Sequence, residues 1–476
     1  MELYQDNSSG KIFAFFAISF LICLGTSLWI DTPLLTLLPF AVAIFYALWS
    51  DPRLLFFVLL FTLPLSTELQ VSAEFSTDFP DELLMIFSTG VLITMLVYQR
   101  MPGLRNYLAH PLFAILILTL LWIIITIISS DYYLISIKYL LAKTWYLGAF
   151  LIFPFLILKK KEDIISTIRI LCFTMFGVVL IILARHLMDG FSFMGINEAV
   201  KPFFRNHVNY SAMLVCVLPL AFVLYKRADS TFARSLFILI LLVFIVALFF
   251  SYARGAWLAL LTGAIAHVLI KRRLLLIFFI SFIVVIAGLI GWMGHEKKYL
   301  EYAHDFRSTI YHENFRDHLQ ATYQGKDVST AERFYRWIAG VRMVQERPIT
   351  GFGPNTFYNN YKGYTIPAYK TWVSKNEERS TVHNYFLLIT IEQGIPGLLL
   401  FLLLIGGMFY YCENLYASAK DRFNRYAALV VGIILVMILT LNFLSDLIET
   451  DKVGSIFFLC LATLIIVDMK ERRLHT

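Results

Sequence analysis

The chain has 476 residues, of which 59% are hydrophobic and 15% are charged, and its mean hydropathy is +0.72. Soluble domains average about 45–50% apolar and about 25% charged residues, so this composition excludes an ordinary soluble protein. The formal net charge of +7 fits Lys- and Arg-rich cytoplasmic loops. The basic clusters are short and scattered, which argues against nucleic-acid binding.

Apolar runs of about 20 residues, each long enough to cross a hydrocarbon core of roughly 30 Å, recur along almost the whole chain. These runs lack the polar–apolar alternation of barrel strands, and helices satisfy their own backbone hydrogen bonds in lipid. We therefore predict an all-α polytopic membrane protein with roughly 12–14 transmembrane helices and a large, partly helical loop. The predicted spans are residues 11–30, 33–50, 52–66, 82–99, 111–129, 134–158, 163–184, 210–225, 234–250, 253–270, 274–293, 385–411, 425–445 and 453–468.

Lys and Arg are concentrated in alternate loops, which is the pattern of cytoplasmic loops. These loops lie near residues 53, 100–105, 159–161, 226–227, 271–273 and 420–425, and the C-terminal tail adds residues 470–473. Both termini are then predicted to be cytoplasmic, and the longest loop lies on the opposite side. We divide the chain into an N-terminal bundle (1–200), helices that carry an Arg turn (201–293), the large loop (294–384) and C-terminal helices (385–476).

Within the large loop, the sequence predicts a helix from about residue 329 to 346. Phe334, Trp337, Ile338, Val341 and Val344 recur at helical spacing and form one apolar stripe, which we expect to lie on the membrane surface or on the bundle. Pro348 then stops the helix. Gly351 and Gly353 permit a tight turn that other residues resist.

Three arginines on the outer side are candidates for anion binding. Arg254 lies between two apolar spans with almost no loop, and ionisable groups at such depth are functional candidates. Arg333 and Arg336 stand one turn apart near the start of the loop helix, where a bound anion would gain from the helix N-terminus and the guanidiniums. The alternatives are a snorkelling Arg254 and, for the other two, contacts with lipid phosphates or nearby acids.

Other ionisable groups share this outer depth, and together they would line a basic, outward-facing cavity. They are Lys138, Lys143, Arg185, His186, Arg205 and His207. His383 opens a span in Thr381-Val382-His383-Asn384-Tyr385. Its neutral imidazole would accept a proton from a hydroxyl near neutral pH, although a His at a membrane interface is often only an anchor.

The ordered set of motifs between about residues 200 and 400 resembles the O-antigen ligase and O-antigen polymerase superfamily of bacterial inner-membrane, GT-C-like glycosyltransferases. The resemblance rests on Ser251-x-x-Arg254-Gly255-x-Trp257, Arg333-x-x-x-Trp337, Arg347-Pro348-Ile349-Thr350-Gly351-Phe352-Gly353, His383-Asn384, Glu392-x-Gly394-x-x-Gly397 and the Asn-rich segment 206–210. Roughly fourteen spans is somewhat more than the dozen usual in the ligases.

The resemblance implies a multi-pass protein of the bacterial inner membrane whose large loop is periplasmic. It implies transfer of a glycan from undecaprenyl diphosphate to a sugar hydroxyl, on lipid A-core for a ligase and on another lipid-linked glycan for a polymerase. The ligases work without a metal or other cofactor and invert the anomeric centre. Arg254 and Arg333 would then bind the diphosphate, and His383 would be the catalytic base. The substrate-binding candidates are Arg336, Trp337, Arg205, His207, Lys138, Lys143 and Arg185.

Two other function classes stay open. Many spans and buried lysines also fit a transporter of lipid-linked glycans, although no internal repeat or matched pair of broken helices stands out. A metal-dependent glycosyltransferase would use outer acids such as Asp446, Glu449 and Asp451, which the acidic bias of that loop also explains.

Overall fold

A computed structural model describes residues 18–27, 30, 38–72, 75–98, 103–295, 328–367 and 381–475. Parts of the predicted first span and of the large loop, residues 296–327 and 368–380, lie outside the described residues. The chain divides into two compact units, residues 1–58 and 59–476. The first unit contains the helix 18–27 and α2 (Leu38–Ser50).

Ten helices in the described part of the chain are long and apolar enough to cross a membrane, which confirms an all-α polytopic fold. They coincide with the ten spans predicted from residue 111 onward. They are α6 (Pro111–Ile128), the composite helix Tyr133–Ile157, α9 (Lys161–Met188), α11 (His207–Arg227), α12 (Thr231–Phe250), α13 (Arg254–Arg272), α14 (Leu275–Gly294), α18 (Tyr385–Ser418), α19 (Arg422–Leu444) and α20 (Asp451–His475).

Short elements connect or interrupt these helices. The composite helix consists of α7 (Tyr133–Leu147), a π-helical turn (Gly148–Ile152) and α8 (Phe153–Ile157). The others are α5 (Leu104–Leu108), α10 (Ile196–Ala199), α17 (Phe357–Asn360) and the 3₁₀ turns Tyr361–Tyr364 and Leu447–Glu449.

The structure differs from the prediction near the N-terminus. The predicted spans 33–50 and 52–66 correspond to α2 and α3 (Pro52–Thr62), which meet at a bend of 116° and together have the length of one span. The predicted span 82–99 is α4 (Asp81–Val97), one residue below the 18 that we take as a span. The acidic loop between them forms an antiparallel hairpin of β1 (Thr67–Ser72) and β2 (Phe75–Phe79).

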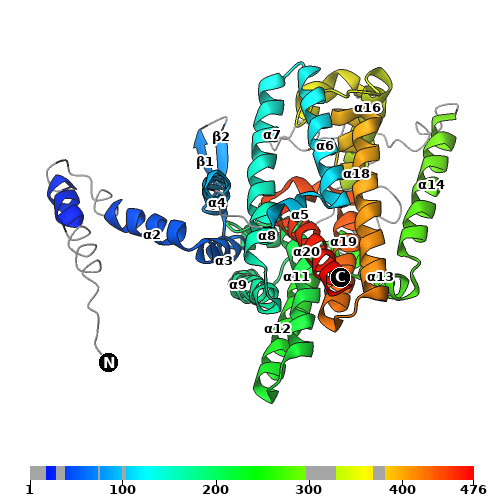
Figure 1. The fold of residues 1–476 in the computed structure, drawn as a ribbon. Coiled ribbons are helices and arrows are strands. Elements are labelled where there is room, and N and C mark those ends of the chain that lie inside the picture. The colour runs from blue at the N-terminus through cyan, green and yellow to red at the C-terminus, as the bar shows by residue number, and fades with distance from the viewer. Residues whose placement is uncertain are drawn as a thin grey trace, which may run out of the picture. The chain divides into compact units, whose positions relative to one another are not determined.

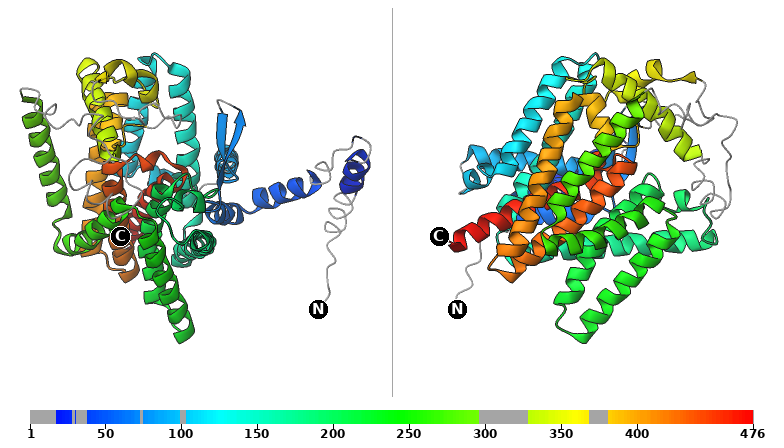
Figure 2. Two further views of the ribbon diagram at one scale, coloured as in Figure 1. Left: turned by 180° about the vertical axis from the view of Figure 1, so that it is seen from behind. Right: turned by 90° about the vertical axis from the view of Figure 1, so that its right-hand side faces the viewer.

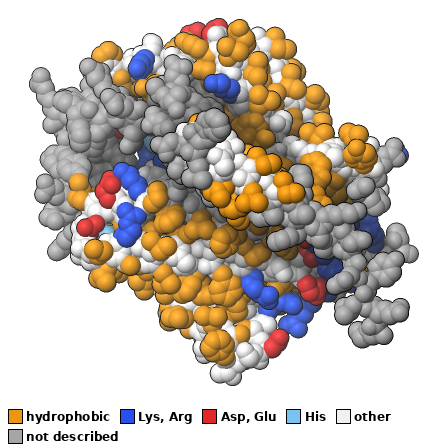
Figure 3. Space-filling view, turned by 90° about the vertical axis from the view of Figure 1, so that its left-hand side faces the viewer, with side chains coloured by type: hydrophobic (Ala, Val, Ile, Leu, Met, Phe, Trp, Pro, Cys, Tyr) orange, Lys and Arg blue, Asp and Glu red, His pale blue; other side chains and the backbone are white. Residues whose placement is uncertain are grey.

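In Figure 1, α6, α7 and α18 stand side by side, and α16 (Val328–Glu346) lies at their upper ends, while α12 points to the opposite end. The views in Figure 2 show the same arrangement from behind and from the side. Hydrophobic side chains cover much of the face drawn in Figure 3, and Lys and Arg gather at a few separate places. Exposed apolar side chains on α12 and α14 are suited to contact lipid.

Three predicted cytoplasmic loops and the C-terminal tail meet at one end of the bundle. Lys161 forms an ion pair of 2.7 Å with Asp421, and the Arg227 guanidinium lies 5.8 Å from the ring centroid of Phe423. Lys470 Nζ donates to the Leu158 carbonyl at 3.3 Å. Segments that the charge pattern assigns to one side therefore contact each other, as an alternating path through a bilayer requires.

α18 is a helical hairpin rather than one straight helix. Tyr385 and Phe401 are 16 residues apart, or about 24 Å along a straight helix, yet their ring centroids lie 5.2 Å apart. The chain reverses at Gly394, whose φ of +70° and ψ of −178° are not helical, and Pro396 follows it. Residues 385–393 therefore pack against residues 395–401, and the start of α18 lies deeper than its break.

Residues 347–357 hold this break in place. The carbonyls of Ile391 and Glu392 cannot form regular helical bonds there, and they accept from Phe352 N at 3.0 Å and from Gly353 N at 2.9 Å. The Glu392 carboxylate accepts from the backbone N–H groups of Asn355 at 2.8 Å and Phe357 at 3.1 Å. We call residues 347–357 the clasp, because they fasten the end of α16 to the broken turn.

The predicted loop helix is confirmed as α16, which contacts the bundle, although of the predicted apolar stripe only Ile338 is fully buried. Ile338 is buried, and a Cβ added at Gly340 would lie 2.8 Å from Ile391 and 3.3 Å from Leu387. α16 thus lies against the first half of α18. Since Arg336 and Trp337 contact the carbonyls of Thr381 and Val382, the middle of α16 lies at the level of the start of α18.

We expect Gly394→Ala to abolish or strongly reduce folding, because the added Cβ would overlap the Ile349 carbonyl oxygen and the positive φ disfavours any L side chain. Gly177→Ala is the matched control, since that helical glycine has open space around its Cβ position and the change should alter stability by about 1 kcal/mol or less. Thermal unfolding of the purified chains, followed by size-exclusion fluorescence, measures both. Equal melting temperatures would contradict the tight fit at the break.

Candidate active site

Three helix ends meet at the deeper level just described. Tyr385 N donates to the Ser445 carbonyl at 2.9 Å, and Asn384 Nδ2 donates to the Phe443 carbonyl at 3.0 Å, which ties the start of α18 to the end of α19. A Cβ added at Gly255 would lie 3.3 Å from Leu444, so the start of α13 packs on the same end of α19. Arg254, the first residue of α13, and His383 therefore both lie at this end.

His383 is placed between a helix cap and two guanidiniums. It has a left-handed φ of +54°, and the next residue, Asn384, caps α18 by accepting from Leu387 N at 2.9 Å. Burial, then the charge of Arg336, then that of Arg333, lower the pKa of His383 from 6.5 to about 3. The imidazole is therefore neutral near pH 7, and the structure brings Arg333 and Arg336 within electrostatic reach of it.

Arg336 directs its guanidinium at protein groups. It is 1% exposed, its Nε lies 2.8 Å from Glu332 Oε1, and its Nη1 donates to the Thr381 carbonyl at 2.8 Å. The Tyr361 ring centroid lies 5.7 Å from Cζ. Trp337 Nε1 donates to the Val382 carbonyl at 3.0 Å. These two predicted substrate-binding residues thus hold the segment that presents His383.

Lys143 has an acidic partner. Its Nζ lies 3.1 Å from both carboxylate oxygens of Glu449, and the hydroxyls of Tyr139 and Tyr385 donate to Glu449 Oε1 at 3.1 Å and 2.7 Å. The ion pair neutralises the lysine charge that the sequence made a candidate for anion binding. Glu449, which was considered only as a metal ligand, instead links α7 to the start of α18.

Three other predicted basic residues contact protein groups between α9 and α11. Arg185 donates to the carbonyls of Lys201 and Glu198, His186 Nε2 lies 2.9 Å from the Ser192 carbonyl, and His207 Nδ1 lies 2.8 Å from Asn197 Oδ1. Lys138 is exposed on α7. These contacts stabilise the connection between α9 and α11. A similar predicted depth in the membrane was therefore not enough to predict which basic residues lie near one another.

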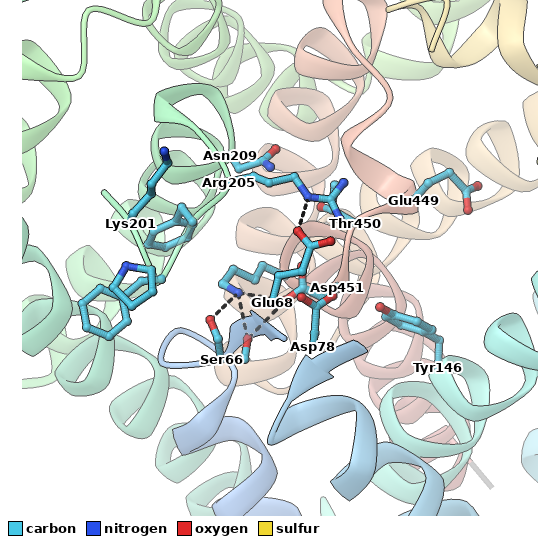
Figure 4. Close-up of a pocket in the computed structure, with 14 residues that line it drawn as sticks. Ser66, Glu68, Asp78, Tyr146, Lys201, Arg205, Asn209, Glu449, Thr450 and Asp451 are labelled. Carbon is cyan, nitrogen blue, oxygen red and sulfur yellow. Dashed lines mark hydrogen bonds and ion pairs between the residues drawn. The ribbon is translucent and has the colours of Figure 1, made fainter. Parts of the chain in front are cut away.

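A polar cavity of about 390 Å³ lies between α7 and the starts of α11 and α20 (Figure 4). Arg205 lines it and forms an ion pair of 2.8 Å with Glu68. Its lining residues are Ser66, Glu68, Asp78, Tyr146, Lys201, Pro202, Phe203, Phe204, Arg205, Asn209, Glu449, Thr450, Asp451 and Lys452. Arg254, Arg333 and His383 are not among these described lining residues, so the cavity is separate from the His383 cluster.

Glutamates are the functional candidates that sequence reasoning missed. Glu392 holds the clasp and Glu332 compensates Arg336, and both are buried. Glu332 stands four residues before Arg336, which is the spacing of an ion pair on a helix. This partner of Arg336 could therefore have been identified from the sequence. Among the described residues, no group of three or more His, Cys, Asp and Glu side chains is placed to hold a metal ion.

Comparison with known proteins found a matching family model and a similar protein. A family model described as O-Antigen ligase matches residues 237–402, a segment that contains Arg254, Arg333, Arg336 and His383. This part of the chain is therefore similar to the O-antigen ligase family. A protein of Salmonella typhimurium named O-antigen ligase is 24% identical over 214 residues, which are 44% of this chain and 48% of that relative. The chain thus aligns with about half the length of this superfamily member.

Arg336→Met should destabilise the protein by about 3–5 kcal/mol, because it leaves the Glu332 carboxylate buried without its cation. The double variant Glu332→Leu/Arg336→Met removes both charges and should recover much of the loss. Melting temperatures of the wild type, both single variants and the double variant complete the cycle. If the double variant is as unstable as the sum of the single variants, the two side chains do not act as a pair.

Proposed function

We propose that the chain transfers a glycan from an undecaprenyl-diphosphate carrier to a sugar hydroxyl of a lipid acceptor on the periplasmic face of the inner membrane. The large loop would then be periplasmic and both termini cytoplasmic. The observation that carries the proposal is a neutral His383 beside Arg333, at the helix ends where Arg254 lies, all within the segment that matches the O-antigen ligase model.

The donor diphosphate would be bound by Arg254 and Arg333. Arg254 is the first residue of α13, so the positive end of the helix dipole acts beside it. Negative charge develops on the diphosphate as the sugar leaves. Fixed cations in a site that excludes most water stabilise that charge without a metal ion.

His383 would act as the general base. The acceptor hydroxyl oxygen forms a bond to the anomeric carbon, the bond from that carbon to the diphosphate oxygen breaks, and the hydroxyl proton passes to the imidazole. Attack opposite the leaving group inverts the anomeric centre. An imidazole with a pKa near 3 is a weak base, but a bound diphosphate offsets the nearby guanidinium charges and raises the pKa towards the useful range.

The names of the family and of the relative favour ligation to lipid A-core over polymerisation of repeat units. A deletion strain separates the two. Long lipid-linked polymer together with unsubstituted core supports a ligase, whereas core that bears a single repeat unit supports a polymerase. Flux of lipid-linked glycan into liposomes without a covalent product would instead support transport.

Arg254→Ala, Arg333→Ala and His383→Ala should each lower transfer by roughly 100-fold or more, since each removes a charge-stabilising or proton-accepting group. Transfer is measured in detergent from a purified lipid-diphosphate donor to defined acceptors. Arg234→Ala is the control, because Arg234 lies at the opposite end of the bundle on α12. Near-normal transfer by all three variants, with normal insertion, would refute the site.

The pH dependence of transfer should distinguish the free enzyme from the donor complex. With a free-enzyme pKa near 3, His383 stays neutral as pH falls through 6.5, so kcat/KM for the donor should show no loss from this residue there. The bound diphosphate raises that pKa, so kcat should fall on the acid side at a higher pH than kcat/KM. Profiles from pH 4.5 to 9, compared with His383→Gln, provide the test. A kcat/KM limb near 6.5 that His383→Gln removes would contradict the proposed environment.

A further inference from the structure

The cavity near Arg205 presents polar groups that the protein itself does not use. The Asp78 carboxylate, the Tyr146 hydroxyl and the Asn209 side-chain amide all line it, and none has a hydrogen bond to another side chain or backbone group in the described part of the chain. Figure 4 shows these three side chains around the cavity, on different elements. A ligand there would meet a carboxyl, a phenol and an amide.

The basic side chains around the cavity already have acidic partners. Arg205 pairs with Glu68, and Lys201 pairs with Glu198 at 2.7 Å. Lys452 Nζ donates three hydrogen bonds, to Asp451 Oδ2 at 2.8 Å, to Ser66 Oγ at 2.8 Å and to the Ser66 carbonyl at 3.3 Å. A phosphate or a metal ion would have to compete with these pairs, whereas an uncharged ligand leaves them intact.

The state of Asp78 agrees with a neutral ligand. Burial, followed by the charge of Asp451, raises the pKa of Asp78 to about 7. Near neutral pH the group is therefore partly protonated and both donates and accepts hydrogen bonds. Carboxyl and amide groups that do both are suited to the hydroxyls of a sugar ring.

The shape and apolar part of the lining fit the same ligand class. Phe203 is half-buried and Pro202 is exposed, so both offer apolar surface beside the polar groups. The volume of about 390 Å³ lies within the range of about 300–1,000 Å³ of small-molecule sites. Such a combination suits a ring with one apolar face and several hydroxyls.

We propose that this cavity binds an uncharged saccharide unit, as a glycan subsite next to the transfer site. The inference deepens the proposed function and rests on it. Glu449 connects the two places, because it lines the cavity and accepts from Tyr385, two residues after His383. A glycan bound in the cavity would thus lie against the side chain that contacts the start of α18.

Saturation-transfer NMR on the full chain in phospholipid nanodiscs tests the proposal without sugar-bearing detergents. The probes are D-glucose, D-galactose and N-acetyl-D-glucosamine, with inorganic phosphate as the charged comparison. We expect at least one sugar to bind, and Asn209→Ala to weaken its binding about 3- to 10-fold, as the loss of one or two hydrogen bonds implies. Asn106→Ala, an exposed asparagine at α5, is the matched control and should bind as the wild type does.

Phe203→Ala provides a second variant, with exposed Phe222→Ala on α11 as its control. The subsite is supported if the wild type binds a sugar and either cavity variant binds it more weakly at an unchanged melting temperature. Sugar binding that both cavity variants leave unchanged, no sugar binding, or displacement of the sugar by phosphate overturns it.

The result is independent of transfer. If sugar binds at the cavity but the chain transfers no glycan, the proposed function fails and the binding site stands. If the chain transfers glycan, the bound sugar should inhibit transfer. Competition with the donor shows that the donor supplies the saccharide in the cavity, and competition with the acceptor shows that the acceptor does.

Discussion

The broken turn of α18 at Gly394 is the constraint on which the candidate site depends. A break in a buried helix leaves carbonyls without their regular helical partners, and these need other donors. Here Phe352 N and Gly353 N bond two of them, and Trp122 Nε1 donates to the Gln393 carbonyl at 2.8 Å. The break is thus paired with protein groups from α6 and the clasp. Because the reversal turns residues 385–393 back along the bundle, it also sets the depth of His383.

The second constraint is electrostatic. Two guanidiniums beside a half-buried imidazole repel protonation, and one of them, Arg336, is balanced by Glu332 and by the Thr381 carbonyl. The two neighbouring arginines therefore have different roles. Arg336 fixes the segment 381–383 through its protein contacts, while Arg333 contributes charge beside His383.

Helices that follow from local apolar periodicity were predicted from the sequence, whereas features that depend on contacts between distant residues were not. The ten spans from residue 111 and the helix 329–346 follow from apolar spacing, which neighbouring residues determine. The hairpin within α18 was missed because the apolar run 385–411 continues across Gly394, and Pro396 alone does not distinguish a kink from a reversal. The predicted basic cavity did not anticipate the acidic partners of Lys143 and Arg205, because Glu449 and Glu68 lie 306 and 137 residues away in the chain.

Glu449 shows how the site and the polar cavity are joined. Its carboxylate accepts from Tyr385 and Tyr139 and pairs with Lys143, so it is held by α7 and α18 at once. A hydrogen-bonded carboxylate with several donors has little freedom to move without breaking contacts of about 1 kcal/mol or more each. Any group that bonds Glu449 from the cavity side therefore acts on a side chain already coupled to the helix that begins beside His383. The proximity of the two places follows from the reversal at Gly394, because a straight α18 would carry Tyr385 away from Glu449 and would leave the cavity without this link.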